Sequence, residues 1–308
     1  MNLSTDAQAS ARAFIVAHAR PLERAWYAYQ FESGPAEAVL DTLAAFQNAD
    51  GGFGHGLEPD VQLPNSSAIG TTVGLQHLRE LNADASNLLV KRAIAYLLAT
   101  YDPSIQTWQI IPDNVDDAPH APWWAFDDEL SQRWRGFLAN PRAEIVGYLY
   151  EYASLVPQEL RDQLGEAAAS YIEGDPHLEM HDLLCYIRLV ETDTLPETLR
   201  KRMMAKLVGA VDEMVARDPA AWAEYGLQPL TVVNSPESPF AGLLADAIPV
   251  NLDYLIQQQG GDGAWAPNWS WFGMYDDAWP AAEQAWKGVL TLNALRTLRV
   301  FGRFAPTD

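Results

Sequence analysis

Residues 47–54, Gln-Asn-Ala-Asp-Gly-Gly-Phe-Gly, return in varied form at 258–265 as Gln-Gln-Gly-Gly-Asp-Gly-Ala-Trp. Both stretches follow a segment with helical periodicity, and both run from glutamine through Asp-Gly to an aromatic residue. Glycine supplies the positive φ angles that end a helix and turn the chain sharply. The aspartate can hydrogen-bond to nearby backbone. We therefore predict repeated turns between helices, with positive φ at some of Gly51, Gly52, Gly261 and Gly263.

Helical periodicity dominates the rest of the chain, and strand-like alternation is nearly absent. Residues 35–47 begin with a proline, which suits the first turn of a helix, and place their apolar side chains on one stripe. Residues 66–81 open with Ser66 and Ser67 as N-cap candidates. Further helices are predicted at 5–31 with a break at Pro21, and at 84–100, 142–155, 157–172, 177–191, 196–217, 239–258 and 280–301.

Weaker echoes of the repeated loop occur around Trp108 and Trp222. The steps from Phe53 to Trp108 (55 residues) and from Trp222 to Trp265 (43 residues) suit one helical hairpin per repeat. A period spread over the chain favours a closed or solenoidal array over two unrelated domains. We therefore predict one all-α domain over residues 1–308, built from about 10–12 helices paired as hairpins.

The charge balance limits the partners of the chain. Its formal net charge is -21, from 20 Lys and Arg against 41 Asp and Glu, so no general field attracts phosphate backbones or anionic lipid. No apolar run approaches the roughly 18 residues that a membrane span requires. We expect a small-molecule partner, hydrophobic or sugar-like, with no nucleic acid and no transmembrane segment.

The N-terminus and the cysteine count favour a cytoplasmic protein. Residues 1–12 lack a basic region followed by a continuous apolar run, so no secretory signal is predicted. The single cysteine, Cys185, excludes an internal disulfide and is compatible with a reducing compartment.

The loops at 47–54 and 259–265 resemble the Gln-Trp repeats of the terpenoid cyclase and protein prenyltransferase superfamily, also described as prenyltransferase and squalene oxidase repeats. The resemblance implies an α/α toroid (α6/α6 barrel) of inner and outer helices around a central cavity. Such toroids also serve carbohydrate-active enzymes and non-catalytic proteins, so the fold alone does not assign a reaction.

Two branches of this superfamily make different demands on the residues. Protein prenyltransferase β subunits carry a zinc site of one Asp, one Cys and one His. Here His181 and Cys185 have helical spacing rather than an Asp-x-Cys arrangement, so no zinc site is expected. Class II terpene cyclases use an Asp-x-Asp-Asp motif whose middle aspartate protonates an alkene. Asn114-Val115-Asp116-Asp117 is similar to that motif, and Asp116 falls at the position of the proton donor.

Three loops rich in acids and aromatic rings are predicted to meet at one mouth of the barrel: 54–60, 108–124 and 265–279. Like charges close together, and burial against tryptophan, raise the pKa of a carboxyl group, which can then act as a general acid beside a carboxylate or histidine. The catalytic candidates are Asp116, Asp117, Glu58, Asp60, His55 and His120. The substrate-binding candidates are Trp108, Trp123, Trp124, Trp265, Trp269, Trp271, Phe272, Asp276, Asp277 and Trp279.

Three functions remain open at this point. The first is a class II terpene cyclase-like enzyme acting on an isoprenoid-type substrate, with Asp116 as the acid and the aromatic faces stabilising a carbocation. The second is a carbohydrate-active hydrolase or lyase, in which Glu58 or Asp60 and Asp116 or Asp117 flank a glycosidic bond. The third is a binding protein without chemistry. The carboxylates of the second loop also suit a hard cation such as Mg²⁺, so a magnesium requirement stays open.

Overall fold

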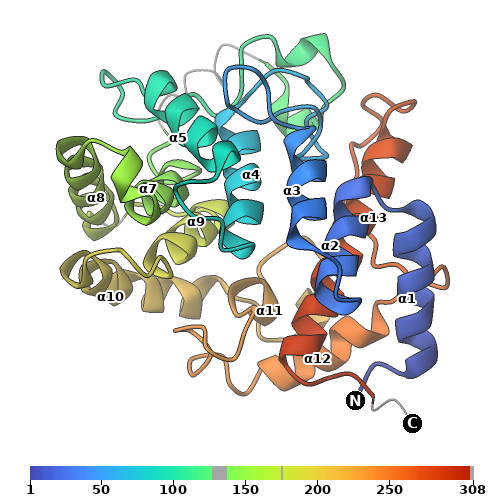
Figure 1. Cartoon of the computed structure of the whole chain (residues 1–308). Coiled ribbons are helices and arrows are strands. Elements are labelled where there is room, and N and C mark those ends of the chain that lie inside the picture. The colour runs from blue at the N-terminus through green and yellow to red at the C-terminus, as the bar shows by residue number, and fades with distance from the viewer. Residues whose placement is uncertain (127–136, 175, 306–308) are drawn as a thin grey trace. The chain divides into compact units, whose positions relative to one another are not determined.

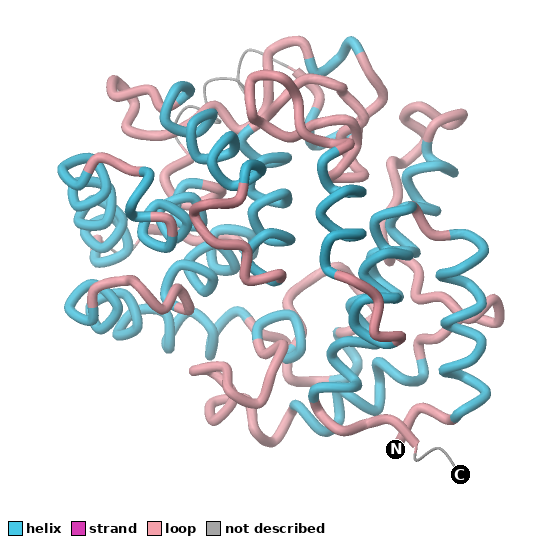
Figure 2. The backbone as a smooth tube through the Cα atoms, in the orientation of Figure 1, coloured by secondary structure: helices cyan, strands magenta, loops and turns pink. Residues whose placement is uncertain are grey.

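The computed structural model describes residues 1–126, 137–174 and 176–305. Within these residues the chain forms twelve α-helices and four short 3-10 helices, and extended segments pair only as isolated bridges (Figure 2). The predicted all-α class is therefore confirmed. No helix in this described part is long and apolar enough to cross a membrane.

The chain divides into two compact units, which are described separately. The middle unit spans residues 43–213, and the terminal unit joins residues 1–42 to 214–308. The middle unit holds α4 (Ala68–Glu80), α5 (Leu88–Thr100), α7 (Arg142–Glu151), α8 (Gln158–Glu173) and α9 (Met180–Val190), with most of α10 (Glu197–Met214). The terminal unit holds α1 (Thr5–His18), α2 (Pro21–Phe31), α11 (Pro229–Val232), α12 (Ile248–Gln257) and α13 (Trp279–Val300), and α3 (Ala36–Ala44) lies across the boundary.

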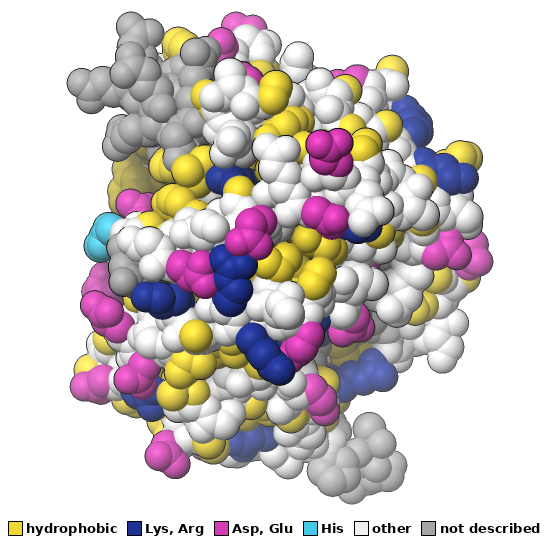
Figure 3. Space-filling model, turned by 90° about the vertical axis from the view of Figure 1, so that its left-hand side faces the viewer, with side chains coloured by type: hydrophobic (Ala, Val, Ile, Leu, Met, Phe, Trp, Pro, Cys, Tyr) yellow, Lys and Arg dark blue, Asp and Glu magenta, His cyan; other side chains and the backbone are white. Residues whose placement is uncertain are grey.

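Helix α7 is the centre of the middle unit. It packs against α8 and α9, and α4 packs against both α5 and α7 (Figure 1). Residues 142–150 of α7 are all buried, as expected for a helix that is covered on every side. Exposed charged residues of this unit lie on helices such as α8 and α10. Figure 3 views the side on which these two helices lie in Figure 1, and acidic and basic side chains are interspersed there.

In the terminal unit, helix α1 packs against α2 and α13, and α2 also packs against α13. The two ends of the described chain pair with each other. Leu3 donates its N–H to the carbonyl of Arg303 at 2.8 Å and accepts the N–H of Ala305 at 2.9 Å. The N-terminal helix is therefore fixed beside the last helix of the chain.

Most predicted helix limits are close to those observed. Pro21 starts a new helix, and the Ser67 hydroxyl caps α4 by accepting the N–H of Gly70 at 2.9 Å. The helix predicted at 239–258 is wrong in its first half, because α12 begins only at Ile248 and the preceding residues form turns. Pro249 has a fixed φ and no N–H, so it suits the first turn of a helix and not its interior.

The repeated loop at 47–54 is held by its glutamine and its aspartate. Gln47 donates its side-chain amide to the carbonyls of Gly51 (3.0 Å) and Leu89 (2.9 Å), and Leu89 lies in the first turn of α5. Asp50 accepts the N–H of Gly52 at 3.0 Å. The loop is thereby closed on itself and tied to the start of a helix.

The loop at 258–265 repeats these bonds. Gln259 donates to the carbonyls of Gly263 and Ala7, both at 2.9 Å, and Asp262 accepts the N–H of Ala264 at 3.1 Å. Ala7 lies near the start of α1. Helix α1 therefore has the same contact with the last loop of the chain that α5 has with the loop at 47–54.

The aromatic residue of each loop is also fixed in the same way. Phe53 donates its N–H to the hydroxyl of Thr71 in α4 at 3.1 Å, and Trp265 donates its N–H to the hydroxyl of Thr291 in α13 at 3.0 Å. Both rings are buried. Two of the four glycines predicted to include positive φ angles have them, with φ 95° at Gly51 and 87° at Gly263, so that prediction is confirmed.

A third version of the loop occurs at the weaker echo around Trp108. Asp102 donates its N–H to the carbonyl of Thr107 at 3.0 Å, and Gln106 takes the positive φ, 54°, two residues before the tryptophan. The buried Trp108 indole donates to the carbonyl of Leu97 at 2.6 Å. All three loops therefore place a positive φ angle two residues before their aromatic residue, although only two of them have the glycine-rich sequence.

Candidate functional site

Two of the three predicted loops, 54–60 and 108–124, lie side by side in the middle unit. Val61 and His120 form an antiparallel bridge. Gln62 donates its N–H to the carbonyl of Pro119 at 3.0 Å, and Ala121 donates its N–H to the carbonyl of Asp60 at 2.8 Å. These backbone bonds bring the acids and histidines of two distant segments into one region.

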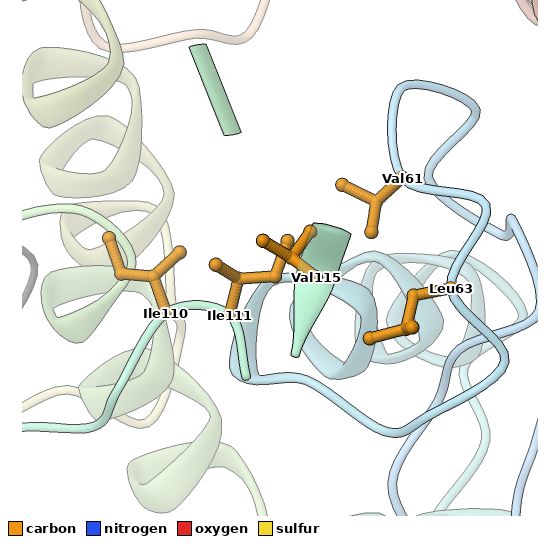
Figure 4. Packing of buried hydrophobic residues seen from close by; sticks show 5 residues of the cluster. All are labelled: Val61, Leu63, Ile110, Ile111 and Val115. Atoms are coloured by element: carbon orange, nitrogen blue, oxygen red, sulfur yellow. The ribbon is translucent and has the colours of Figure 1, made fainter. Parts of the chain in front are cut away.

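An apolar cluster fixes these loops although they contain little regular structure. Its buried members are Val61, Leu63, Ile110, Ile111 and Val115, which come from both loops (Figure 4). The partly buried rings of Trp124 and Phe126 pack against it. Removing this apolar surface from water stabilises the loop pair and so holds its polar side chains in place.

Asp116 and His120 are in contact at the edge of this cluster. Asp116 lies in the short 3-10 helix η1 (Val115–Asp117), and one of its oxygens, Oδ1, is 2.9 Å from Nε2 of His120. The same oxygen accepts the N–H of Phe126 at 3.0 Å. The histidine ring is fully buried, whereas the aspartate side chain is 53% exposed. Solvent therefore reaches the Asp116 carboxyl group but not the His120 ring that contacts it.

The His120 ring lies between two oxygen atoms. Its Nε2 faces the Asp116 carboxyl group, and its Nδ1 lies 2.9 Å from the carbonyl oxygen of Ala121. Both partners are oxygen acceptors, and a neutral imidazole has only one N–H to donate. While it is neutral, the ring can therefore donate to only one of these two oxygens at a time.

The other acids of these loops have separate partners. Asp117 is exposed and accepts the side-chain amide of Asn114 at 3.1 Å. Glu58 is half-buried, and its carboxylate accepts the N–H of Asp60 at 3.3 Å. The Asp60 side chain is buried. Of the predicted acids, Asp116 is therefore the one that combines exposure with a bond to a buried histidine.

His55 belongs to a different group of polar residues. Its Nε2 is 2.8 Å from the side-chain oxygen of Asn48, and Asn48 in turn donates to the hydroxyl of Ser66 at 3.0 Å. Ser66 donates to Asp50 at 2.7 Å. A shallow pocket of about 400 Å³ lies here, lined by Asn48, Ala49, Asp50, Pro64, Asn65 and Ser66. These bonds stabilise the repeated loop, so His55 is placed with that loop and not with Asp116.

The aromatic candidates of the second loop differ in exposure. Trp108 is buried and closes the third version of the repeated loop through its indole N–H. Trp123 is 40% exposed, and Trp124 is partly buried on the apolar cluster, both within the short 3-10 helix η2 (Pro122–Trp124). Trp123 is the tryptophan of this loop that lies closest along the chain to Asp116, seven residues away, whereas Trp108 and Trp124 are each eight residues away.

The third predicted loop, 265–279, belongs to the terminal unit and is described within it. Trp265 and Trp271 are buried there, and Trp271 contacts Trp279 at a ring separation of 5.6 Å. Trp269 is partly buried and packs edge-on against Trp286 at 5.1 Å. The inner part of this loop is therefore an aromatic core of its own unit.

The outer part of the same loop is exposed. The Phe272 side chain is 79% exposed, and Asp276 and Asp277 are also exposed. Phe272, Gly273 and Tyr275 all have positive φ angles. Whether this loop contributes to substrate binding stays a prediction.

Sequence reasoning missed a buried group of charges centred on Glu144 of α7. The Glu144 side chain is 2% exposed, and its carboxylate accepts the hydroxyl of Tyr148 (2.6 Å), the amide of Gln76 (2.8 Å) and the guanidinium of Arg188 (3.0 Å). Arg79 of α4 lies over the Tyr148 ring, 4.4 Å from its centre. Polar residues at helical spacing in an apolar segment were the available signal.

This group of charges determines the chemistry of the single cysteine. Burial, together with the negative charge of Glu144, raises the pKa of the Cys185 thiol well above its usual range. Cys185 is therefore protonated at neutral pH and is a weak nucleophile and a weak metal ligand. Burial, together with the positive charge of Arg188, lowers the pKa of the neighbouring His181. Among the residues that the structure describes, no cluster of three or more His, Cys, Asp and Glu side chains is arranged to hold a metal ion.

No family model, no curated protein and no solved structure matches this chain. Where the two loops of the middle unit meet, Asp116 is the exposed acid and His120 is its buried partner.

Proposed function

We propose that the chain is a class II terpene cyclase-like enzyme in which Asp116 protonates an alkene of an isoprenoid-type substrate. The contact of the exposed Asp116 carboxyl group with the buried His120 imidazole carries this proposal. In the protonation step the O–H bond of Asp116 breaks and a C–H bond forms from the π electrons of the alkene, which leaves a carbocation. His120 holds the Asp116 side chain in place through its contact with Oδ1 at 2.9 Å. Loss of a proton from the cation, or capture of water, ends the reaction, and solvent returns a proton to the exposed Asp116.

The surroundings of Asp116 suit a cationic intermediate. Phe126 is bonded to the carboxyl group through its N–H, and its ring packs with Trp124 on the apolar cluster. Aromatic faces attract cations through their quadrupole, by about 0.5–2 kcal/mol per ring. The low content of basic residues fits a hydrophobic substrate better than one held by several cations.

The sugar-cleaving alternative is supported less well. A two-carboxylate glycosidase needs a second carboxyl group across the scissile bond from the acid. The group that contacts Asp116 is an imidazole, and Asp60 meets the second loop through its backbone carbonyl. An acid that contacts a histidine is typical of sites for proton transfer, whereas a glycosidase of this kind uses two carboxyl groups.

Asp116→Asn is expected to abolish the acid-dependent activity, by at least about 100-fold, because an amide keeps the shape but has no acidic proton. The measurement is product formation from farnesyl, geranylgeranyl and squalene-type substrates, followed by mass spectrometry with and without Mg²⁺. Asp117→Asn is the matched control, since Asp117 is exposed and bonded to Asn114. It should keep most of the activity.

Two outcomes would contradict the assignment. Cyclised products that persist in Asp116→Asn exclude Asp116 as the acid. No product from the wild-type chain across the whole panel excludes the cyclase function itself. Circular dichroism on the Asp116→Asn variant should show unchanged helicity, so that a loss of product reports on chemistry.

We also propose that the helical hairpins form the α/α toroid that the repeated loops imply. The support is the contact of Gln259 with α1, which matches the contact of Gln47 with α5. In a solenoid with open ends, the first helix is not expected to contact the last repeated loop, as α1 contacts the loop at 258–265.

Small-angle X-ray scattering tests this arrangement. One compact toroid of 308 residues should have a radius of gyration of about 19 Å. A value several ångströms larger, together with a pair-distance distribution showing two maxima, would contradict a single closed domain.

A further inference from the structure

Arg142, the first residue of α7, is buried without a counter-charge. Its side chain is only 2% exposed, and within the described part of the chain it makes no hydrogen bond or ion pair. Nε of the guanidinium is fully enclosed and has no partner. A buried charge without a partner costs several kcal/mol, so this arrangement is unusual.

The other buried or half-buried arginines of the middle unit are paired. Arg188 meets Glu144 at 3.0 Å, and Arg79 pairs with Glu151. Arg142 is more deeply buried than either. Among the described residues, Arg188 and Arg79 thus each have a carboxylate partner, whereas Arg142 has none.

Three tyrosines lie close enough to Arg142 to interact with its charge: Tyr101, Tyr171 and Tyr186. The Tyr186 hydroxyl is satisfied, because it donates to the carbonyl of Ala168 at 2.8 Å. The Tyr101 hydroxyl is buried and has no partner. Burial lowers the pKa of Arg142, and the nearby tyrosines partly offset this effect. The cationic guanidinium of Arg142 and the neutral hydroxyl of Tyr101 are therefore both donors without an acceptor among the described residues, in a region rich in tyrosine rings.

We propose that Arg142 and Tyr101 bind the carboxylate of a small-molecule ligand at the N-terminal end of α7. A guanidinium offers two parallel N–H groups that match a carboxylate, and a phenol adds a third donor. The N-terminus of a helix favours negative charge as well. The single positive charge of Arg142 matches a ligand with one negative charge. The tyrosine rings suit a ligand whose remaining part is apolar or aromatic. This inference does not depend on the proposed reaction at Asp116.

Thermal unfolding of the full chain tests the site. The probes are sodium formate, acetate and benzoate, each at the same ionic strength as a sodium chloride reference, with benzyl alcohol as the uncharged analogue. The wild-type Tm should rise with the carboxylates, most with benzoate, and not with benzyl alcohol. Titration calorimetry with benzoate should show binding that Tyr101→Phe weakens about 10-fold, which is the loss of one hydrogen bond to a charged group.

Arg142→Met separates a binding role from a structural one. It should abolish the carboxylate shift, while its Tm in chloride alone should equal or exceed that of the wild type, because an unpaired buried charge has been removed. Arg24→Met is the matched control, since Arg24 is an exposed arginine on α2. It should keep the full carboxylate shift.

Several results would overturn the proposal. One is a wild-type chain whose Tm responds no more to benzoate than to chloride, and another is a carboxylate shift that survives in Arg142→Met. If Arg142→Met does not fold, an unchanged benzoate affinity in Tyr101→Phe overturns it instead. A larger Arg142-dependent shift with inorganic phosphate than with benzoate would overturn the carboxylate assignment.

Discussion

Glu144→Ala is expected to lower the free energy of unfolding by about 3 kcal/mol or more, because removing one partner of a buried ion pair leaves the other partners uncompensated. The carboxylate of Glu144 accepts hydrogen bonds from Tyr148, Gln76 and Arg188. All three donors lose this acceptor in the variant, and the Tyr148 hydroxyl keeps only a long contact of 3.5 Å with the carbonyl oxygen of Thr72. The Arg188 side chain is 38% exposed, so water screens part of its charge and the loss should fall at the lower end of the range for buried pairs.

The size of this effect should depend on burial and not on the removal of a carboxylate as such. Glu166→Ala is the matched control, because Glu166 also pairs with an arginine, Arg202 at 2.7 Å, but is 59% exposed. Its cost should stay below about 1 kcal/mol. Both variants can be measured by urea unfolding followed at the helical circular dichroism signal. Equal losses in the two variants would show that the Glu144 group contributes no more than a surface ion pair.

The Glu144 group also shows why the contacts between buried charges could not be predicted from the sequence. The repeated loops were predictable because Gly51 and Asp50 act on their own turn, within a few residues along the chain. The partners of Glu144 come from other helices, 68 residues away at Gln76 and 44 residues away at Arg188. Only the packing of α4, α7 and α9 brings them together. Local pattern therefore identifies the helices but not the charges that they enclose.

The candidate site was predictable to a similar, partial degree. Asp116 and His120 are four residues apart and were both named as candidates from the sequence. Their contact follows from the short 3-10 helix and from the bridge between His120 and Val61, which no pattern in either loop indicates. Arg142 was missed because its distinguishing property is a missing partner, and that property exists only once the fold has buried it.

Gly263→Ala is expected to lower the free energy of unfolding by about 2–5 kcal/mol, through backbone strain and steric overlap. Gly263 has φ 87°, a conformation that side chains with a Cβ rarely adopt. A Cβ at this position would also lie well inside van der Waals contact with the carbonyl oxygen of Ser10 in α1. Backbone cannot move aside as a flexible side chain can, so α1 itself would have to shift.

Gly261, in the same loop, provides a matched control for this prediction. No atom lies within 4 Å of the Cβ that an alanine would add there, and its φ is not positive, so Gly261→Ala should change stability by less than about 1 kcal/mol. Gly51→Ala should repeat the large loss, since its Cβ would overlap the carbonyl oxygen of Arg92 in α5. Thermal or urea unfolding of the three variants would compare the two loops directly. A large loss at Gly51 with none at Gly263 would mean that α1 is free to move away from the last loop, and that the first helix does not complete the repeat as α5 does.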